Sequence, residues 1–178
     1  QKVIPIRARN TEQQFTLDAL QDDSVRVGAV LGKAGTGKTL LALAAGLSRY
    51  DSGNYAKVIV VRPTTVIGKD LGYLPGSLAE KESPFMAPIK DNLSILYDYD
   101  KPADRWAEES WKIEIEKGSL ELTTPVYLRG RSLMRFYIIV DEAQNLTYHE
   151  VKTIITRIGE GTKVVFVIRS RAQTNLTK

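Results

Sequence analysis

Short apolar runs rich in Val and Ile alternate along this chain with longer, helix-like segments. The runs that predict strands are Val25–Leu31, Lys57–Arg62, Leu120–Thr123, Phe136–Asp141 and Lys163–Ile168. Parallel strands are usually connected by helices, because the chain must cross back over the sheet before it pairs again. The alternation therefore predicts an α/β fold with a mainly parallel central sheet.

The segments between these runs that predict helices are Lys38–Arg49, Ile89–Tyr97, Asp104–Lys117 and Thr147–Ile158. The first is apolar and rich in Ala, which suits a helix covered by the sheet and its neighbours. The third is rich in acids and is expected on the surface. The last begins with a capping box, because Thr147 is followed three residues later by Glu150.

One long stretch, Thr64–Pro88, has no regular pattern. It contains Pro75, Pro84 and Pro88 together with three glycines. Both residue types interrupt helices and strands. We therefore expect this stretch to be mostly loop with short helical pieces.

Composition narrows the possible classes of protein. The chain has 178 residues, of which 43% are apolar. This length fits one domain, 1–178, that can bury roughly 70% of its unfolded surface. There is no cysteine and one histidine, His149, which excludes disulfide scaffolds, cysteine zinc sites, thiol catalysis and multi-histidine metal sites. No G-x-S-x-G is present, which argues against a serine hydrolase.

Charge is distributed unevenly around a net value of +4. Residues 98–121 contain eight acids and four bases, whereas 122–178 contain four acids and nine bases. A basic C-terminal third is compatible with contacts to phosphate or nucleic acid, and equally with an ordinary solvated surface.

The longest apolar runs are too short to span a membrane, and no signal peptide opens the chain. We therefore expect a soluble, cytoplasmic protein with no membrane partner. Because the sequence begins at Gln1 and not at Met, we also expect it to be a fragment of a longer protein.

The most specific motif is Gly32-Lys-Ala-Gly-Thr-Gly-Lys-Thr39, which fits G-x-x-x-x-G-K-[ST] and lies between a predicted strand and a predicted helix. Its glycines let backbone N–H groups surround a polyphosphate, and the helix N-terminus adds a positive dipole. We expect Lys38 to reach the β- and γ-phosphates and the Thr39 hydroxyl to ligate Mg²⁺.

A second motif follows the strand predicted at Phe136–Asp141. Asp141 and Glu142 come at the carboxyl end of this strand, the edge where α/β sheets bind ligands. We expect Asp141 to hold Mg²⁺ through a water molecule, and Glu142 to orient or deprotonate an attacking water. The adjacent glutamate favours hydrolysis over phosphoryl transfer to a small molecule.

Gln13 lies before the first predicted strand. A carboxamide donates to and accepts from an adenine edge at once, which favours ATP over GTP. The alternative is a surface glutamine at the start of a helix.

Two further segments have charge near the predicted ligand edge. Arg129 and Arg131 precede the acidic strand and could contact the phosphates of a nucleotide or of a nucleic acid, or form a solvated basic turn. Arg62 ends the second predicted strand and Thr64 follows it, at a place where helicase-like ATPases contact the nucleic-acid backbone. A role without such a contact is equally credible.

The order of motifs resembles that of the PhoH family, most closely the type whose ATPase domain follows an N-terminal PIN ribonuclease domain. The motifs are Asn-x-Glu-Gln, GKAGTGKTLLALAAGL, VVRP, GKDLGYLPG, RGRS, VDEAQN and EVKTIITRIG, and the likeness spans 5–168. It implies a three-layer RecA-like P-loop ATPase, related to superfamily-one helicases, that acts on RNA and is commonly hexameric. Residues 70–130 then form a family-specific insertion. No PIN domain is present in this sequence, so nuclease activity is not expected of it.

The resemblance also assigns roles to matching residues. Lys38, Asp141, Glu142 and Arg169 are expected to be catalytic, and Thr39 with Asp141 to hold the metal. The expected ATP-binding residues are Gln13, Gly32, Lys33, Ala34, Gly35, Thr36, Gly37, Lys38, Thr39 and Leu40. Gln144 is expected to couple the nucleotide to a nucleic-acid side.

One departure concerns the last strand, which in the family runs into a Gly-Asp-x-x-Gln sensor of the γ-phosphate. Here Ile168 leads directly to Arg169-Ser-Arg-Ala-Gln173. Either the sensor is reduced to Gln173, or an intervening segment is missing and Arg169-Ser170 is the arginine-finger motif that follows it. We favour the second interpretation.

Three functions fit these observations. The first is an ATP-hydrolysing, helicase-like domain acting on single-stranded RNA. The second is a nucleotide-switched oligomeric assembly module without direct action on nucleic acid. The third is a small-molecule kinase, which the DEAQ motif and the lack of an arginine-rich lid disfavour.

Overall fold

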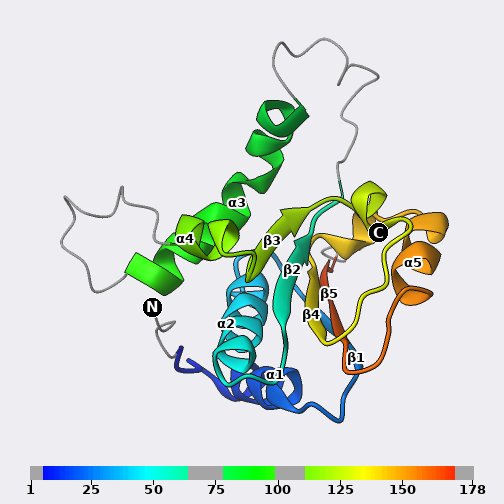
Figure 1. Ribbon diagram of the computed structural model, residues 1–178. Coiled ribbons are helices and arrows are strands. Elements are labelled where there is room, and N and C mark those ends of the chain that lie inside the picture. Colours follow the sequence, from blue (N-terminus) through cyan, green and yellow to red (C-terminus); the bar gives the residue numbers. More distant parts are fainter. Residues whose placement is uncertain (1–5, 64–77, 99–110, 171–178) are drawn as a thin grey trace, which may run out of the picture.

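A computed structural model describes residues 6–63, 78–98 and 111–170, except for the side chains of residues 78–84 and 98. Its centre is a five-stranded sheet in which every neighbouring pair of strands is parallel. The strands are β1 (Val27–Gly32), β2 (Lys57–Val61), β3 (Leu120–Thr123), β4 (Phe136–Val140) and β5 (Lys163–Arg169). Their order across the sheet is β1-β5-β4-β2-β3 (Figure 1). The predicted α/β class and all predicted strands are confirmed, with ends that move by up to two residues.

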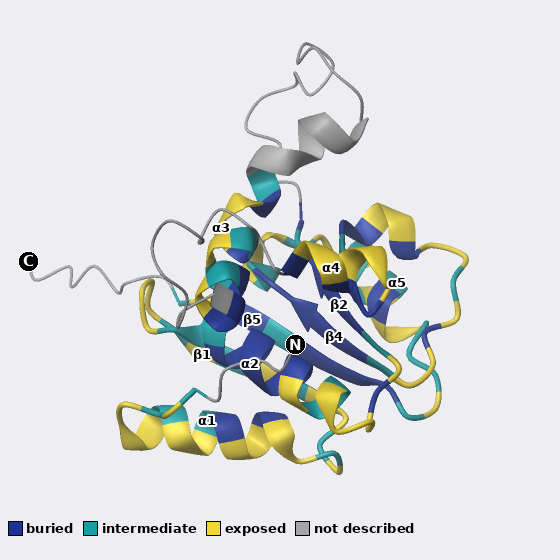
Figure 2. Cartoon of the chain, turned by 60° about the vertical axis from the view of Figure 1, so that its left-hand side comes forward, coloured by how far each residue is buried: buried dark blue, intermediate teal, exposed yellow. Residues whose placement is uncertain are grey.

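Helices cover both faces of this sheet, as expected for a three-layer fold (Figures 1 and 2). On one face, alternate strand residues such as Val58, Val60 and Ile139 pack with α1 (Thr11–Gln21), α2 (Lys38–Asp51), α3 (Leu78–Asp98) and α4 (Trp111–Glu116). On the other, the intervening residues pack with η3 (Pro125–Leu128), η4 (Ala143–Asn145) and α5 (Tyr148–Ile155). The strands are buried on both faces because side chains alternate along a strand.

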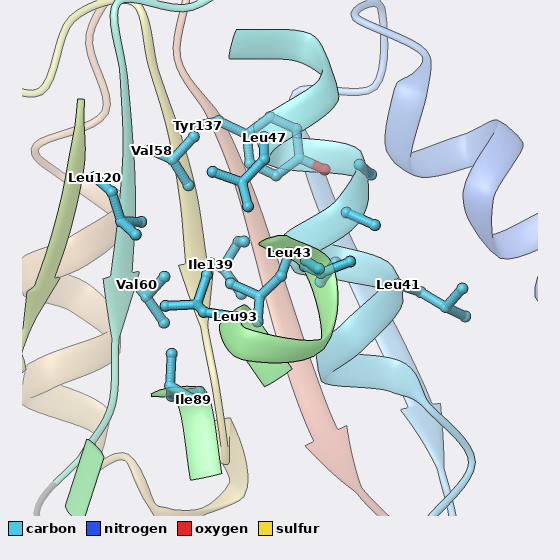
Figure 3. Packing of buried hydrophobic residues seen from close by; sticks show 14 of the residues in the cluster. Leu41, Leu43, Leu47, Val58, Val60, Ile89, Leu93, Leu120, Tyr137 and Ile139 are labelled. Carbon is cyan, nitrogen blue, oxygen red and sulfur yellow. The ribbon is translucent and has the colours of Figure 1, made fainter. Parts of the chain in front are cut away.

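Helix α2 crosses the centre of the first face, where Leu43 and Leu47 contact the sheet residues Val58 and Ile139 (Figure 3). It approaches the sheet closely at Gly46. A Cβ at this position would lie 2.8 Å from Cδ1 of Tyr137, which is closer than packed carbon atoms approach. A residue without a side chain is therefore required where the helix passes over the Tyr137 ring.

Helix α1 was not predicted from the sequence. It buries only Leu17 and Leu20, so its apolar pattern is weak. Asn10 caps its first turn, and the fully buried Lys163 donates to the carbonyl oxygens of Ala19 and Asp22 at its last turn. The helix is thus held by tertiary contacts that no local pattern reveals.

The prediction that Thr64–Pro88 is mostly loop is wrong for its final part, because residues 78–88 belong to α3. Prolines at 84 and 88 each remove one backbone hydrogen bond, at a cost of about 3 kcal/mol in a helix interior. The side chains buried on this helix include Met86, Ile89, Leu93 and Leu96. At about 1.5–3 kcal/mol each, their burial equals or exceeds the loss. Residues 64–77 lie outside the described part of the chain.

The remaining helices differ in extent from their predictions. Of the predicted helix Asp104–Lys117, α4 covers Trp111–Glu116, and residues 104–110 are outside the described ranges. Helix α5 has the predicted capping box at Thr147, but ends at Ile155 and not Ile158. The chain turns there because the N–H of Gly159 donates to the carbonyl of Leu133, which draws the segment towards β4.

The predicted insertion at 70–130 contains an integral part of the sheet. Its β3 pairs with β2, and its α3 covers part of the first face. No helix within the described residues is both long enough and apolar enough to cross a membrane.

Candidate nucleotide-binding site

The loop between β1 and α2 forms the floor of the site. Gly35 and Gly37 adopt φ angles of 75° and 83°, a left-handed backbone conformation that other residues rarely adopt. The left-handed conformation at these two glycines reverses the direction of the loop, which then leads into α2 at Lys38. The unpaired N–H groups of that first turn and the helix dipole favour an anion in front of it.

Lys38 is held close to this loop. Its Nζ donates to the carbonyl oxygen of Lys33 at 2.6 Å and lies 3.4 Å from Oγ1 of Thr36. Phosphate oxygens in front of the loop would compete for the same ammonium protons, and a charged acceptor forms the stronger bond. The lysine is therefore positioned for a polyphosphate.

Thr39 and Asp141 meet although they are far apart in sequence. The Thr39 hydroxyl donates to Oδ1 of Asp141 at 2.8 Å. Asp141 follows β4, and its other oxygen lies 3.6 Å from NH1 of Arg62, which follows β2. The parallel arrangement places these residues at the carboxyl edge of the sheet, as the sequence predicts.

Asp141 is only 3% exposed. Burial raises the pKa of its carboxyl above the ordinary value, against the opposing effects of the Thr39 hydroxyl and the Arg62 guanidinium. A hydroxyl and a buried carboxylate in contact are the hard oxygen ligands that Mg²⁺ uses beside phosphates. Thr39 and Asp141 therefore fit a Mg²⁺ site. Within the described ranges no cluster of three or more acidic or histidine side chains forms a metal site by itself.

Glu142 lies next to this pair, in an unusual backbone conformation. Its φ is 49°, which is uncommon for a residue other than glycine and is typical of functional sites. Gln144 Nε2 donates to Oε2 of Glu142, and Gln144 Oε1 accepts from the backbone N–H of Arg169 at 2.9 Å. Gln144 thus joins the glutamate to the end of β5.

Lys38, Thr39, Asp141 and Glu142 line a cavity of about 350 Å³. Its lining combines the glycine-rich loop with the ends of β4 and β5 and one residue of α3. The lining residues are Ala34, Gly35, Gly37, Lys38, Thr39, Leu40, Asn92, Asp141, Glu142, Val167 and Arg169. Sequence reasoning missed Asn92 and Val167, because nothing in their local sequence marks them.

A second hollow of about 420 Å³ lies at the loop and shares part of its lining, including Gly37 and Leu40, with the first. Its polar residue of interest is Gln13, whose Oε1 accepts from the N–H of Arg9 at 2.8 Å and whose Nε2 donates to the carbonyl of Thr36 at 3.2 Å. One amide proton and one lone pair remain for a base edge. Apolar walls come from Ile6, Leu40, Leu41, Ile95 and Leu96. The hollow therefore suits a planar base beside a phosphate cavity.

The predicted arginines separate into two groups. Arg62 and Arg169 lie at the site. Arg131 does not, because both its terminal nitrogens bind Glu121, which also pairs with Lys57. The nucleic-acid contact expected for Arg131 stays a prediction, and in this structure its partner is Glu121.

Gly32 is the last residue of β1 and Lys33 follows it, and neither lines the two cavities although both were predicted to bind ATP. Gln173 lies outside the described residues. Arg129 is exposed and lines none of the cavities described above. Thr64 lies outside the described residues.

Comparison with known proteins agrees with this geometry. A profile described as "PhoH: PhoH-like protein" matches residues 5–178 of the chain. The chain belongs to the PhoH family.

Several PhoH relatives are similar over nearly the whole chain. "Protein PhoH2" of Bacillus subtilis is 48% identical over 163 residues, which are 91% of this chain and 36% of that protein. "Protein PhoH2" of Mycolicibacterium smegmatis is 39% identical over 98% of this chain and 38% of its own length. The "PhoH-like protein" of Synechocystis is 35% identical over 96% of this chain and 48% of its own length. The chain thus spans less than half of these relatives.

A solved structure supports the fold of this PhoH domain. The SWI2/SNF2 ATPase core of Sulfolobus solfataricus, in complex with double-stranded DNA, superposes with a TM-score of 0.55 over 99% of this chain and 36% of its own. The identity is 18%, so the likeness concerns the fold. Family and fold together make this a RecA-like P-loop domain that binds ATP.

Proposed function

We propose that this domain hydrolyses ATP to ADP and inorganic phosphate with Mg²⁺, and that single-stranded RNA controls the turnover. The observation that carries the proposal is the hydrogen bond between Thr39 and Asp141. It joins the phosphate loop to the acidic strand end, and the neighbouring residue is a glutamate that lines the same cavity.

The residues divide the chemistry between them. The loop N–H groups and Lys38 bind the β- and γ-phosphates and stabilise the charge that develops as the bond between them breaks. Glu142 orients a water molecule, which attacks the γ-phosphorus, and receives its proton. ADP leaves with the bridging oxygen, and the phosphate carries the water oxygen. Thr39 and Asp141 would hold Mg²⁺, which would neutralise charge at the phosphates.

The base is proposed to be adenine. Gln13 is fixed at both ends of its carboxamide by the backbone N–H of Arg9 and the carbonyl of Thr36. A fixed carboxamide presents one donor and one acceptor in a defined direction, and adenine offers a matching pair on one edge.

Single-stranded RNA is proposed as the partner on the basis of the family. The basic balance of residues 122–178 supports a polyanionic partner. The structural neighbour was solved with double-stranded DNA, so duplex DNA is the appropriate competitor. A homo-oligomer, with a hexamer as the expected form, is proposed as the assembled state, with Arg169 acting on the cavity of its own chain.

Steady-state release of phosphate from ATP, with and without single-stranded RNA, tests the proposal. Stimulation that is lost in Lys38→Ala supports it. Turnover that ignores RNA and duplex DNA, together with ATP-dependent oligomerisation, would favour the assembly module. A phosphorylated small molecule in place of free phosphate would favour a kinase.

A further inference from the structure

We propose that a hollow beside the nucleotide cavity is a separate binding site for inorganic phosphate, the product cleaved from ATP. This inference rests on the proposed hydrolysis. The hollow has a volume of about 300 Å³ and is lined by Arg62, Pro63, Phe85, Pro88, Glu142, Asn145 and Arg169. No feature of the sequence marks it, because its lining comes from the ends of three strands and from α3 and η4.

Its position fits a product leaving the phosphate end of the nucleotide. Glu142 and Arg169 line both this hollow and the nucleotide cavity, so the two spaces meet at these side chains. Helix α3 runs along both as well. Phe85 and Pro88 line the hollow, and Asn92, one turn further on the same face, lines the nucleotide cavity. A phosphate that moves past Glu142 therefore enters the hollow.

Its charge fits a small oxyanion. The charged residues of its lining are Arg62, Arg169 and Glu142, so cations outnumber acids in the lining. NH1 of Arg62 is buried beside Oδ2 of Asp141, 3.6 Å away, so this nitrogen is turned to the carboxylate and is not open to the hollow. A guanidinium carries five N–H donors, so Arg62 and Arg169 would bind phosphate oxygens with donors other than this one.

Glu142 does not oppose such an ion. Its Oε2 already accepts from Gln144 Nε2. Phosphate near neutral pH retains a proton that can be donated to a carboxylate, whereas a phosphodiester has none. The single acid in the lining therefore favours free phosphate over the backbone of a nucleic acid.

Titration calorimetry of inorganic phosphate binding to the whole chain, without nucleotide, tests this site. The glycine-rich loop also binds phosphate, so the experiment uses a Lys38→Ala background. We expect phosphate to remain bound there, and Arg62→Gln in that background to weaken it at least about tenfold, the loss expected for a charged hydrogen bond. Arg135→Gln, a change at an exposed arginine outside the hollow, is the matched control and should leave phosphate binding unchanged.

Because Arg62 lies beside Asp141, Arg62→Gln also changes the surroundings of that carboxylate, and a second variant controls for this effect. Asn145 is exposed and lines the hollow, and Asn145→Asp adds a negative charge there without touching the metal ligands. It should weaken phosphate binding in the same background and slow phosphate release after a single turnover. Thermal unfolding checks that both variants remain folded.

Three results would overturn the proposal. The first is that Lys38→Ala abolishes all phosphate binding. The second is that Arg62→Gln and Asn145→Asp both leave phosphate binding unchanged. The third is that these two variants weaken the binding of a single-stranded RNA oligonucleotide and not the binding of phosphate. Failure of the proposed hydrolysis looks different. In that case the native chain releases no phosphate from ATP, while the Lys38-independent phosphate site is still titrated.

Discussion

The side-chain carbonyl of Gln144 accepts a hydrogen bond of 2.9 Å from the backbone N–H of Arg169. The amide of the same side chain donates to Glu142. One carboxamide thereby connects the ends of β4 and β5. These ends lie where the nucleotide cavity meets the neighbouring hollow lined by Arg62 and Arg169.

Removal of this connection should affect turnover more than binding. In Gln144→Ala, Glu142 loses its donor and its orientation, so we expect kcat for ATP to fall about tenfold, the cost of roughly one charged hydrogen bond. The Kd for ATP should stay within about twofold of the native value, because Gln144 lines neither the nucleotide cavity nor the base hollow. His149→Ala, an exposed change on α5, is the control. Equal losses in kcat and affinity would contradict the positioning role.

The pair of Thr39 and Asp141 predicts a specific dependence on Mg²⁺. Thr39→Val keeps the shape of the side chain and removes the hydroxyl that bonds Asp141. We expect the Mg²⁺ concentration for half-maximal ATPase activity to rise at least about tenfold. Thr39→Ser retains the hydroxyl and should behave like the native chain. The same Mg²⁺ dependence in Val and Ser variants would exclude Thr39 as a ligand.

Asp141 also predicts a dependence of stability on pH. Burial raises its pKa above the ordinary 3.8, so the folded state holds the proton more tightly than the unfolded chain does. Ionisation of Asp141 therefore lowers the free energy of unfolding as pH rises from the pKa of the unfolded chain through the raised pKa of the folded protein. Below the pKa of the unfolded chain this loss of stability is absent.

Asp141→Asn removes the ionisation. In Mg²⁺-free buffer we expect the free energy of unfolding of this variant to exceed the native value at about pH 7 and to approach it towards about pH 4. Mg²⁺ should stabilise the native chain and not the variant. A variant that is less stable at neutral pH than at acid pH, relative to the native chain, would reverse the sign and refute the argument.

The close approach of α2 to the sheet predicts a large effect of one methyl group. Gly46→Ala would place a Cβ 2.8 Å from the ring of Tyr137, whose position is fixed by its bond to the carbonyl of Leu20. We expect a loss of about 1–3 kcal/mol in the free energy of unfolding, measured in urea.

Gly28→Ala is the matched control for this prediction. A Cβ on Gly28 would meet no described atom within 4 Å, so we expect no loss of stability. Equal destabilisation by both changes would indicate that the loss of glycine itself, and not the contact with Tyr137, is responsible.

The elements that were predicted correctly are those whose pattern lies within a few neighbouring residues. The strands were found because each is a short apolar run buried on both faces, and α5 because its cap lies within four residues. Helix α1 was missed since two buried leucines leave little periodicity. The loop prediction failed over 78–88 because burial of the α3 face equals or exceeds the cost of two prolines.

The sequence by itself determined the family, the parallel α/β class and the chemistry of the phosphate loop and of Asp141 and Glu142. These depend on residue types at fixed short spacings, and short spacings fix local geometry. Only the tertiary structure decided which distant side chains meet. In the folded chain Thr39 bonds to Asp141 and Arg131 pairs with Glu121. Arg62 and Arg169 line one hollow. The order of strands in the sheet sets those contacts, and it results from burial summed over the whole chain.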